Sequence, residues 1–308
     1  MNTPKRFLII VLGPTGIGKT DLTIELAKTF NSEIISCDSR QFYKELNIGT
    51  AVPEKEQLEA VKHHFIQNIS ITDYYNVSNF ENDVINFLKT YHKKNNIALM
   101  TGGSMMYIDA VCNGIDEMPD IDPEIREFYK EKLKNDGIES LRFELKRVDP
   151  EHYNIVDLKN GKRIIRALEI CAQTGKTYTS FRTAPKKERD FEIIKIGLQI
   201  EREKLYERIN KRVDIMIENG LIDEVKANLK NRNLNALNTV GYKELFAYFD
   251  GEYSLEKAIE LIKRNTRHYS RRQISWFNRD KEINWYNPNN FEEIKTFIEG
   301  KLQSSPPS

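Results

Sequence analysis

The segment GPTGIGKT, Gly13 to Thr20, directly follows the apolar run Phe7–Leu12 and constrains the fold more than any other part of the sequence. It fits the phosphate-loop pattern G-x-x-x-x-G-K-[ST], which requires a strand before it and a helix after it. FLIIVL is short and rich in branched residues, as is typical of a parallel strand buried on both faces. Residues 21–30, DLTIELAKTF, carry their apolar side chains along one side of a helix. The alternative is an ordinary glycine-rich turn between a strand and a helix.

The chemistry of this loop suits a phosphate group. Its glycines allow backbone amides to close around an anion, and the positive end of the following helix dipole adds to the field. Lys19 supplies a point charge, and the Thr20 hydroxyl can ligate a magnesium ion. The segment therefore predicts a phosphate site but leaves the identity of the phosphate open.

Composition limits the class of protein. The chain has 308 residues, 39% hydrophobic and 30% charged, which is typical of a globular protein. No apolar run approaches bilayer length, and the N-terminal apolar run lies too close to the loop to be a removable signal, so we expect a cytoplasmic protein. The cysteines are three and scattered, which favours small buried residues over a disulfide framework or a zinc site.

The pattern of elements indicates an α/β fold: a phosphate-loop core with a parallel sheet and an inserted, all-helical subdomain. Apolar strands are expected near Ile34 and at Ile97–Met100, and each ends in small or polar residues, where open parallel sheets bind ligands. Strand character returns at Glu192–Ile200, and INWY near the end of the chain suits an edge strand. The predicted parts are residues 1–114 (core, first part), 115–191 (helical insertion), 192–302 (core, second part, with basic C-terminal helices) and 303–308 (disordered tail).

A carboxylate stands at the end of the second strand, as Asp38 in SCDSRQFY. The third strand ends instead in Thr101-Gly102-Gly103-Ser104, without an acid. At this end of the sheet Asp38 would lie near the phosphate loop as a magnesium ligand, a base for an attacking group, or simply a helix N-cap.

Several segments together resemble the tRNA dimethylallyltransferases, which transfer an isopentenyl-type chain to an adenosine beside the anticodon. The resemblance covers nearly the whole chain. The segments that carry it are GPTGIGKT, DSRQFYKELNIGTAVP from Asp38, VKHHFI from Val61, TGGSMMYIDAV from Thr101, RIIRALE from Arg163 and the C-terminal VGYKELF…TRHYSRRQISWFNRD. The departures are few: Val52 replaces a lysine that is common in the family, and Gly16-Ile17 replaces a more usual Ala-Ser.

The resemblance implies that the loop holds the diphosphate of dimethylallyl diphosphate rather than ATP, with Mg²⁺ on Thr20. Asp38 would accept the proton of the attacking adenine amine, and Thr15 would bond the bridging oxygen. Arg212 resembles the arginine that clamps the diphosphate, with Arg208, one turn earlier, as the competing assignment. The residues implied to bind the diphosphate are Gly13, Pro14, Thr15, Gly16, Ile17, Gly18, Lys19 and Thr20.

The same resemblance implies a tRNA surface that recognises the anticodon stem-loop. The implied residues are Asp38, Ser39, Arg40, Gln41, Ser104, Arg126, Lys162, Arg163, Ile164, Ile165, Arg166, Arg267, Arg271 and Arg272. From the residues alone, the basic groups in the insertion also fit a solvated helix surface, and Trp276 and Phe277 fit either RNA stacking or a core. His63 and His64 fit a hydrogen-bonded strand edge better than a ligand site.

Two other functions remain open on sequence grounds. A phosphate loop with a helical insertion also describes a small-molecule or nucleotide kinase, and a basic C-terminal helix describes an RNA-binding module whose loop holds a structural anion. The segment DS-x-Q-x-Y fits the transferase better than either. The sequence does not indicate which tRNAs are modified, the order of substrate binding or whether a hydroxylated donor is accepted, and a monomer is the default expectation.

Overall fold

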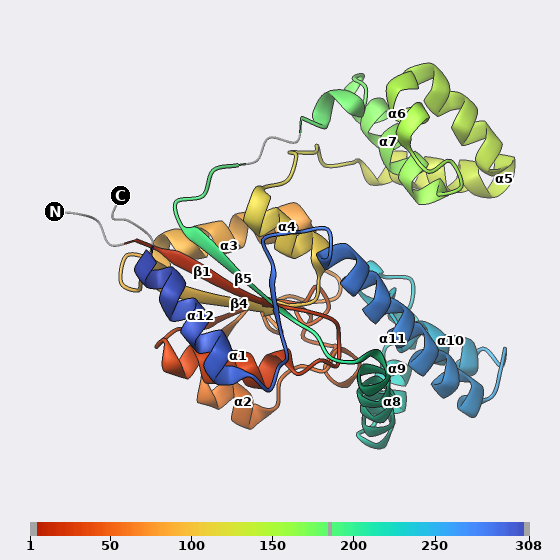
Figure 1. The fold of residues 1–308 in the computed structure, drawn as a ribbon. Coiled ribbons are helices and arrows are strands. Elements are labelled where there is room, and N and C mark those ends of the chain that lie inside the picture. The colour runs from red at the N-terminus through yellow and green to blue at the C-terminus, as the bar shows by residue number, and fades with distance from the viewer. Residues whose placement is uncertain (1–4, 184–186, 305–308) are drawn as a thin grey trace. The chain divides into compact units, whose positions relative to one another are not determined.

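The computed structural model describes residues 5–183 and 187–304 (Figure 1). The chain divides into two compact units. The first combines Met1–Cys112 with Arg189–Ser308, and the second is Asn113–Glu188. The insertion expected at 115–191 corresponds to this second unit, whose ends lie a few residues earlier.

The first unit is built on a six-stranded sheet whose strands follow the order β3-β2-β4-β1-β5-β6, and every pair is parallel. The strands are β1 (Phe7–Leu12), β2 (Ile34–Cys37), β3 (His63–His64), β4 (Ile97–Gly102), β5 (Glu192–Leu198) and β6 (Asn284–Tyr286). The predicted α/β core is thus confirmed: β5 rejoins the sheet beside β1, and the INWY segment forms the edge strand β6.

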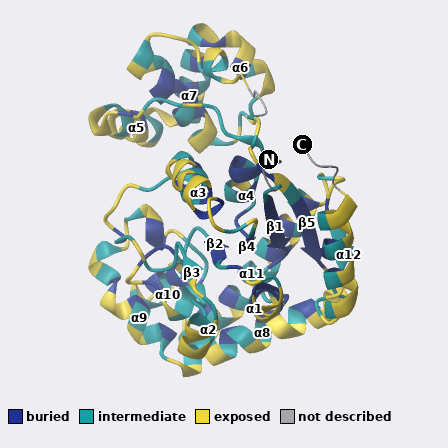
Figure 2. Cartoon of the chain, turned by 90° about the vertical axis from the view of Figure 1, so that its left-hand side faces the viewer, coloured by how far each residue is buried: buried dark blue, intermediate teal, exposed yellow. Residues whose placement is uncertain are grey.

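Helices cover both faces of this sheet, as a doubly wound fold requires. Successive residues of β1 alternate between two apolar cores, so the strand is buried on both sides (Figure 2). Helices α3 and α4 lie on one side of the strands and α1 lies on the other (Figure 1). One core contains side chains of α3 and α4, and the other contains side chains of α1, α8 and α12. The continuous apolar pattern of FLIIVL follows from this burial.

The helices of the first unit include the one expected at residues 21–30. They are α1 (Lys19–Thr29), α2 (Lys55–Ala60), α3 (Val77–Tyr91), α4 (Met105–Asn113), α8 (Arg202–Glu218), α9 (Leu221–Ala227), α10 (Tyr242–Phe249), α11 (Leu255–Phe277) and α12 (Phe291–Ser304), with short 3-10 turns η1 (Ile48–Thr50), η3 (Leu229–Asn231) and η4 (Asn235–Leu237). Helix α1 begins at Lys19, inside the loop motif, because Gly18 takes a left-handed conformation (φ 100°) as its N-cap. The expected disordered tail is wrong at Gln303 and Ser304, which complete α12, and residues 305–308 lie outside the described residues.

The second unit is helical, as predicted. It contains α5 (Pro123–Val148), α6 (Pro150–Ile155), α7 (Gly161–Thr174) and the 3-10 turn η2 (Thr179–Phe181). Helix α5 is broken at Gly137, whose backbone (φ 75°, ψ 179°) is not helical. Its two halves and α7 enclose a separate apolar core, so the unit has its own hydrophobic interior. In the described parts of both units, no helix is sufficiently long and apolar to traverse a bilayer.

Candidate active site

Three loops leave the sheet at neighbouring points. The register pairs Leu12, the end of β1, with Gly102 of β4, and Gly102 in turn with Cys37, the end of β2. Position 102 must be glycine, because a Cβ there would lie 2.0 Å from the Cys37 carbonyl oxygen. The phosphate loop, Asp38 and the Gly103-Ser104 turn therefore emerge side by side at the carboxyl ends of the strands, the usual ligand-binding edge of such a sheet.

The phosphate loop requires glycine at three points. Gly13, Gly16 and Gly18 all have positive φ, which other residues rarely adopt. Lys19 folds back over the loop, and its Nζ donates to the carbonyl oxygens of Gly13 (3.0 Å) and Pro14 (2.9 Å). Burial lowers the pKa of Lys19 to about 8, an effect that Asp38 opposes and Arg212 reinforces. A bound diphosphate would favour the charged form of this lysine.

Two arginines of α8 lie against the loop in different ways. Nη1 of Arg212 donates to the Thr15 hydroxyl (3.4 Å), whereas Nη1 of Arg208 donates to the Ile17 carbonyl oxygen (3.1 Å). Burial lowers the pKa of Arg212, and Asp38 acts in the opposite direction. Arg212 thus shares its surroundings with Thr15, Lys19 and Asp38, which favours it over Arg208 as the diphosphate clamp.

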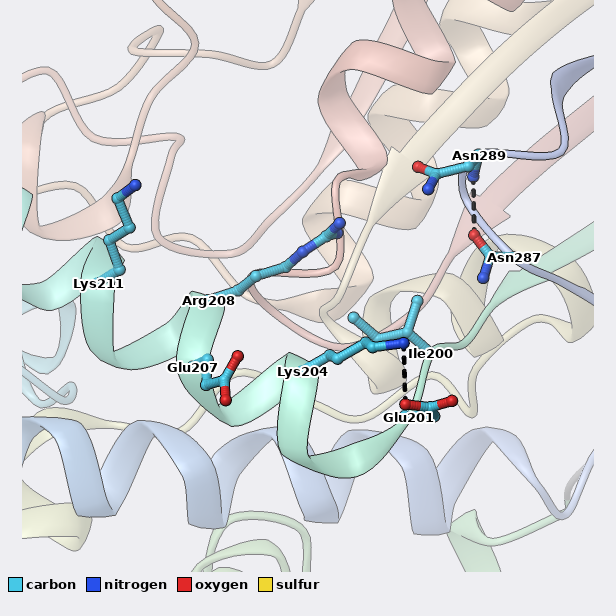
Figure 3. A pocket seen from close by; sticks show the side chains of 8 residues that line it. All are labelled: Ile200, Glu201, Lys204, Glu207, Arg208, Lys211, Asn287 and Asn289. Carbon is cyan, nitrogen blue, oxygen red and sulfur yellow. Dashed lines mark hydrogen bonds and ion pairs between the residues drawn. The ribbon is translucent and has the colours of Figure 1, made fainter.

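Arg208 instead lines a pocket of about 380 Å³ along the amino-terminal half of α8 (Figure 3). Asp38 is not among the residues that line it. They are Ile200, Glu201, Lys204, Glu207, Arg208, Lys211, Asn287 and Asn289. The Lys204 ammonium pairs with Glu201 at 3.0 Å, as Figure 3 shows. Arg208 connects this pocket with the loop, because its guanidinium donates to the Ile17 carbonyl oxygen.

Asp38 lies in a turn rather than at the start of a helix. Its Oδ1 accepts a hydrogen bond from the Arg40 backbone N–H (3.0 Å), which holds the carboxylate in place. Its charge raises the pKa of Lys19 and Arg212 at the loop and of Tyr269 on α11, against or along with the effect of burial. The helix N-cap alternative is therefore wrong, and a carboxylate held beside the phosphate loop is what a general base requires.

The residues after Asp38 are held by the protein itself. Ser104 accepts from the Ser39 N–H (2.8 Å) and donates to the Ser39 hydroxyl (3.1 Å). The Arg40 guanidinium donates to the carbonyl oxygens of Asn235 (2.8 Å) and Ala236 (3.1 Å). Gln41 is bonded at both ends of its amide, accepting from Ser36 (3.1 Å) and donating to the carbonyls of Thr50 and Ala51. We refer to these four residues, Ser39, Arg40, Gln41 and Ser104, as the rim of the site.

Helix α11 supplies two residues that the sequence analysis did not assign to the site. Gln273, 1% exposed, accepts from the Thr15 N–H (2.9 Å) and donates to the Gly103 carbonyl oxygen (2.8 Å). The second residue is Tyr269, and both its burial and the charge of Asp38 raise its pKa. One available signal was missed: Gln273 is a polar residue on the buried stripe of α11, between Ser270 and Phe277.

The basic residues of α11 differ in their surroundings. Arg271 and Arg272 are exposed, and the Arg272 guanidinium lies 5.8 Å from the Tyr269 ring centroid. Arg267 donates to the Asn210 side chain on α8 (2.6 Å). Phe277 is 3% exposed and belongs to the apolar core, so the alternative of RNA stacking is wrong for this residue. Trp276 donates its indole N–H to the Asp109 carboxylate (2.7 Å).

In the second unit, two of the predicted RNA contacts need correction. Ile164 and Ile165 are 0% and 8% exposed and belong to the apolar core of the unit, so their side chains cannot contact RNA. They accompany the basic residues in sequence because α7 turns one face inward. Lys162 and Arg163 are exposed at the start of the same helix.

The two remaining arginines predicted to bind RNA in this unit lie near the same acidic side chain. Arg126 and Arg166 each lie 3.6 Å from the buried Glu169 carboxylate.

A metal site made wholly by the protein is absent from residues 5–183 and 187–304, which contain no group of three or more histidine, cysteine or acidic side chains able to hold an ion. The residues of the loop nevertheless fit a Mg²⁺ ion that is bound together with a substrate. Mg²⁺ commonly takes one or two protein oxygens and completes its shell with substrate phosphates and water, and Thr20 offers such an oxygen in the first turn of α1.

Comparisons with a family model, with related sequences and with solved structures all indicate the same family. Residues 41–280 match the model of the IPP transferase family. A tRNA dimethylallyltransferase 1 from Bacteroides fragilis is 52% identical over 296 residues, covering 96% of this chain and 98% of that protein. The crystal structure of the full-length tRNA isopentenylpyrophosphate transferase from Bacillus halodurans is 33% identical with a TM-score of 0.71, covering 97% of both chains.

A third likeness concerns the fold alone. A eukaryotic dimethylallyltransferase captured in crystals acting on tRNA is 24% identical, with a TM-score of 0.79 over 96% of this chain and 77% of that one. With a phosphate loop, a carboxylate beside it and relatives that match nearly end to end, the chain belongs to the tRNA dimethylallyltransferases, a family of prenyltransferase enzymes.

Proposed function

We propose that this protein transfers the dimethylallyl group of dimethylallyl diphosphate to the exocyclic amine of adenosine 37 in tRNA, next to the anticodon. The products are N6-isopentenyladenosine and pyrophosphate. The observation that carries the proposal is the position of Asp38, which directly follows Cys37 at the sheet edge where Leu12 leads into the phosphate loop. That arrangement supports Asp38 as a proton acceptor that would lie next to the leaving diphosphate.

The loop would stabilise the departing group. Prenyl transfer breaks an allylic carbon–oxygen bond, so negative charge gathers on the diphosphate while positive charge spreads over the allyl group. Loop amides, Lys19 and Arg212 form a preorganised set of donors for that negative charge, which is often the largest catalytic contribution. The Thr15 hydroxyl, already next to Arg212, would bond the bridging oxygen.

Asp38 would act on the nucleophile. The adenine amine is weak because its lone pair is delocalised into the ring, and it forms the new carbon–nitrogen bond as the carbon–oxygen bond breaks. Asp38 accepts the proton that the amine loses, a contribution of roughly two to four powers of ten in rate.

Mg²⁺ would be held by Thr20 together with the diphosphate. When bound, the ion offsets negative charge on the leaving group. The protein's own part is to present the Thr20 hydroxyl at the start of α1, next to Lys19.

The tRNA would be held by exposed basic groups and by the rim of the site. We assign contacts with the phosphate groups of the tRNA to Lys162 and Arg163 in the second unit and to Arg271 and Arg272 on α11. Exposed cations attract phosphates whatever the RNA sequence. The target base leaves the anticodon-loop stack to reach Asp38, at a cost of a few kcal/mol. The remaining proposed contacts are Ser39, Arg40, Gln41, Ser104, Arg126, Arg166 and Arg267. Because tRNA is the substrate, we place the reaction in the cytoplasm, with the monomer as the working assumption.

A nucleoside mass analysis tests the proposal. Unmodified tRNA is incubated with the protein, magnesium and dimethylallyl diphosphate, and a parallel sample contains ATP instead. We expect an adenosine heavier by one isoprenoid unit only in the first sample. Consumption of ATP with no change in the first sample would instead support a kinase and refute the proposal.

A further inference from the structure

Gln273 connects the phosphate loop to the end of a different strand through a single buried amide. Its Oε1 accepts from the Thr15 N–H at 2.9 Å and its Nε2 donates to the Gly103 carbonyl oxygen at 2.8 Å. A backbone N–H can only donate and a carbonyl can only accept, so the amide has one orientation that satisfies both partners. With 1% of its surface exposed, Gln273 has no solvent to replace either bond.

This bond determines what Thr15 can offer a ligand. In a phosphate loop the backbone amides commonly bind the anion. Here the Thr15 N–H is already used by Gln273, so Thr15 can address a diphosphate through its hydroxyl, the group that lies 3.4 Å from Arg212. We infer that Gln273 is a positioning residue for prenyl transfer, which orients Thr15 toward the bridging oxygen of the diphosphate. This inference rests on the proposed function.

The glycine at position 103 leaves room for the Gln273 amide. A Cβ at this position would lie 2.3 Å from the Gln273 Nε2, while the next nearest atom outside Gln273 is the Gly13 carbonyl oxygen at 3.4 Å. The space that glycine leaves at position 103 is therefore filled by the Gln273 amide. An alanine at 103 would displace that amide, yet it would fit once the longer side chain was gone.

The test is a double-mutant cycle with Gly103→Ala and Gln273→Ala, read by steady-state prenyl transfer to tRNA. We expect each single variant to lower kcat by about 10- to 100-fold, because small displacements of reacting groups have effects of that size. The double variant should be no slower than Gln273→Ala, since the clash disappears with the amide. The KM for tRNA should stay within about twofold in all three, because neither residue belongs to the tRNA surface.

Gln273→Met and a control on the same helix complete the experiment. Methionine keeps the length of the side chain and adds no charge, but it has no donor for the Gly103 carbonyl and only a weak thioether acceptor for the Thr15 N–H, so its kcat should fall nearly as far as that of Gln273→Ala. The matched control is Asn265→Leu, which removes an amide of α11 that donates to Glu244 (2.7 Å) far along the helix from the loop. It should leave kcat within about twofold of wild type, because its partner does not touch the loop.

The outcomes separate the inference from the proposed function. Absence of prenyl transfer by the wild-type protein would refute the function itself. Wild-type activity together with near-normal kcat in Gln273→Met would overturn only the positioning role. The same would follow from additive losses in the double variant, or from an equal loss in Asn265→Leu, since either result assigns Gln273 merely to the packing of α11. If Gly103→Ala does not fold, the kcat of Gln273→Met relative to wild type and Asn265→Leu decides the question.

Discussion

The pKa of Lys19 makes diphosphate binding depend on pH in a direction that the structure fixes. Burial lowers this pKa to about 8, so the ammonium loses its proton within an accessible pH range. A diphosphate binds the charged form and raises this lowered pKa again, since opposite charge favours ionisation. Affinity should therefore fall as pH rises through 8 in the ligand-free protein.

The size of the effect follows from the fraction of charged lysine. That fraction is near one at pH 7, one half at pH 8 and about one tenth at pH 9, so affinity should fall about tenfold between pH 7 and pH 9, or about 1.4 kcal/mol. Folding stability should change in the opposite sense. Between pH 8 and 10.5 the unfolded chain binds more protons at this lysine than the folded chain, so the free energy of unfolding rises with pH.

Calorimetry with a non-reactive thio analogue of dimethylallyl diphosphate, at fixed magnesium, measures the first effect, and thermal unfolding of the ligand-free protein measures the second. Lys19→Met serves as the control: its affinity should be low at every pH and without the tenfold slope. An affinity that is flat from pH 7 to pH 9 in the wild-type protein, or equally steep in Lys19→Met, would refute the assignment of this titration to Lys19.

Three further predictions concern the proposed chemistry and the tRNA surface. Asp38→Asn keeps the acceptor for the Arg40 N–H but cannot take a proton, so the single-turnover rate constant of transfer should fall by roughly 10²- to 10⁴-fold while the affinity for tRNA stays unchanged. A loss of less than about tenfold would exclude Asp38 as the general base. Arg212→Met should reduce kcat at least about tenfold more than Arg208→Met, and the reverse order in the same assay would make Arg208 the clamp. Lys162→Ala and Arg163→Ala should each weaken tRNA binding and reduce its salt slope by about 1, and an unchanged slope in a filter-binding titration would place both outside the interface.

The parts of the fold that depend on local pattern could be predicted from the sequence. FLIIVL is apolar throughout because β1 contacts two cores. The glycines of the loop indicate where the backbone takes positive φ angles. Asp38 could be placed near the loop because carboxyl ends of parallel strands meet at one edge. Where several local signals agree, the element and its place in the sheet follow from them.

Contacts between distant segments could not be predicted in this way. Gln273 and Thr15 are 258 positions apart, and neither segment carries a local pattern that names the other. The choice between Arg208 and Arg212 was also undecidable, because residues four apart share one helix face and differ only in what stands opposite. Such choices are made by tertiary packing.

The insertion shows how packing also changes the meaning of charge. Arg126 on α5 and Arg166 on α7 both lie 3.6 Å from the carboxylate of Glu169, whose side chain is 6% exposed. A buried carboxylate needs such partners, so these two arginines offset its charge and connect the two helices. Lys162 and Arg163 carry the exposed positive charge at the start of α7. Of these four cations, Lys162 and Arg163 should therefore contribute most to the attraction of RNA phosphates, although all four looked equivalent in the sequence.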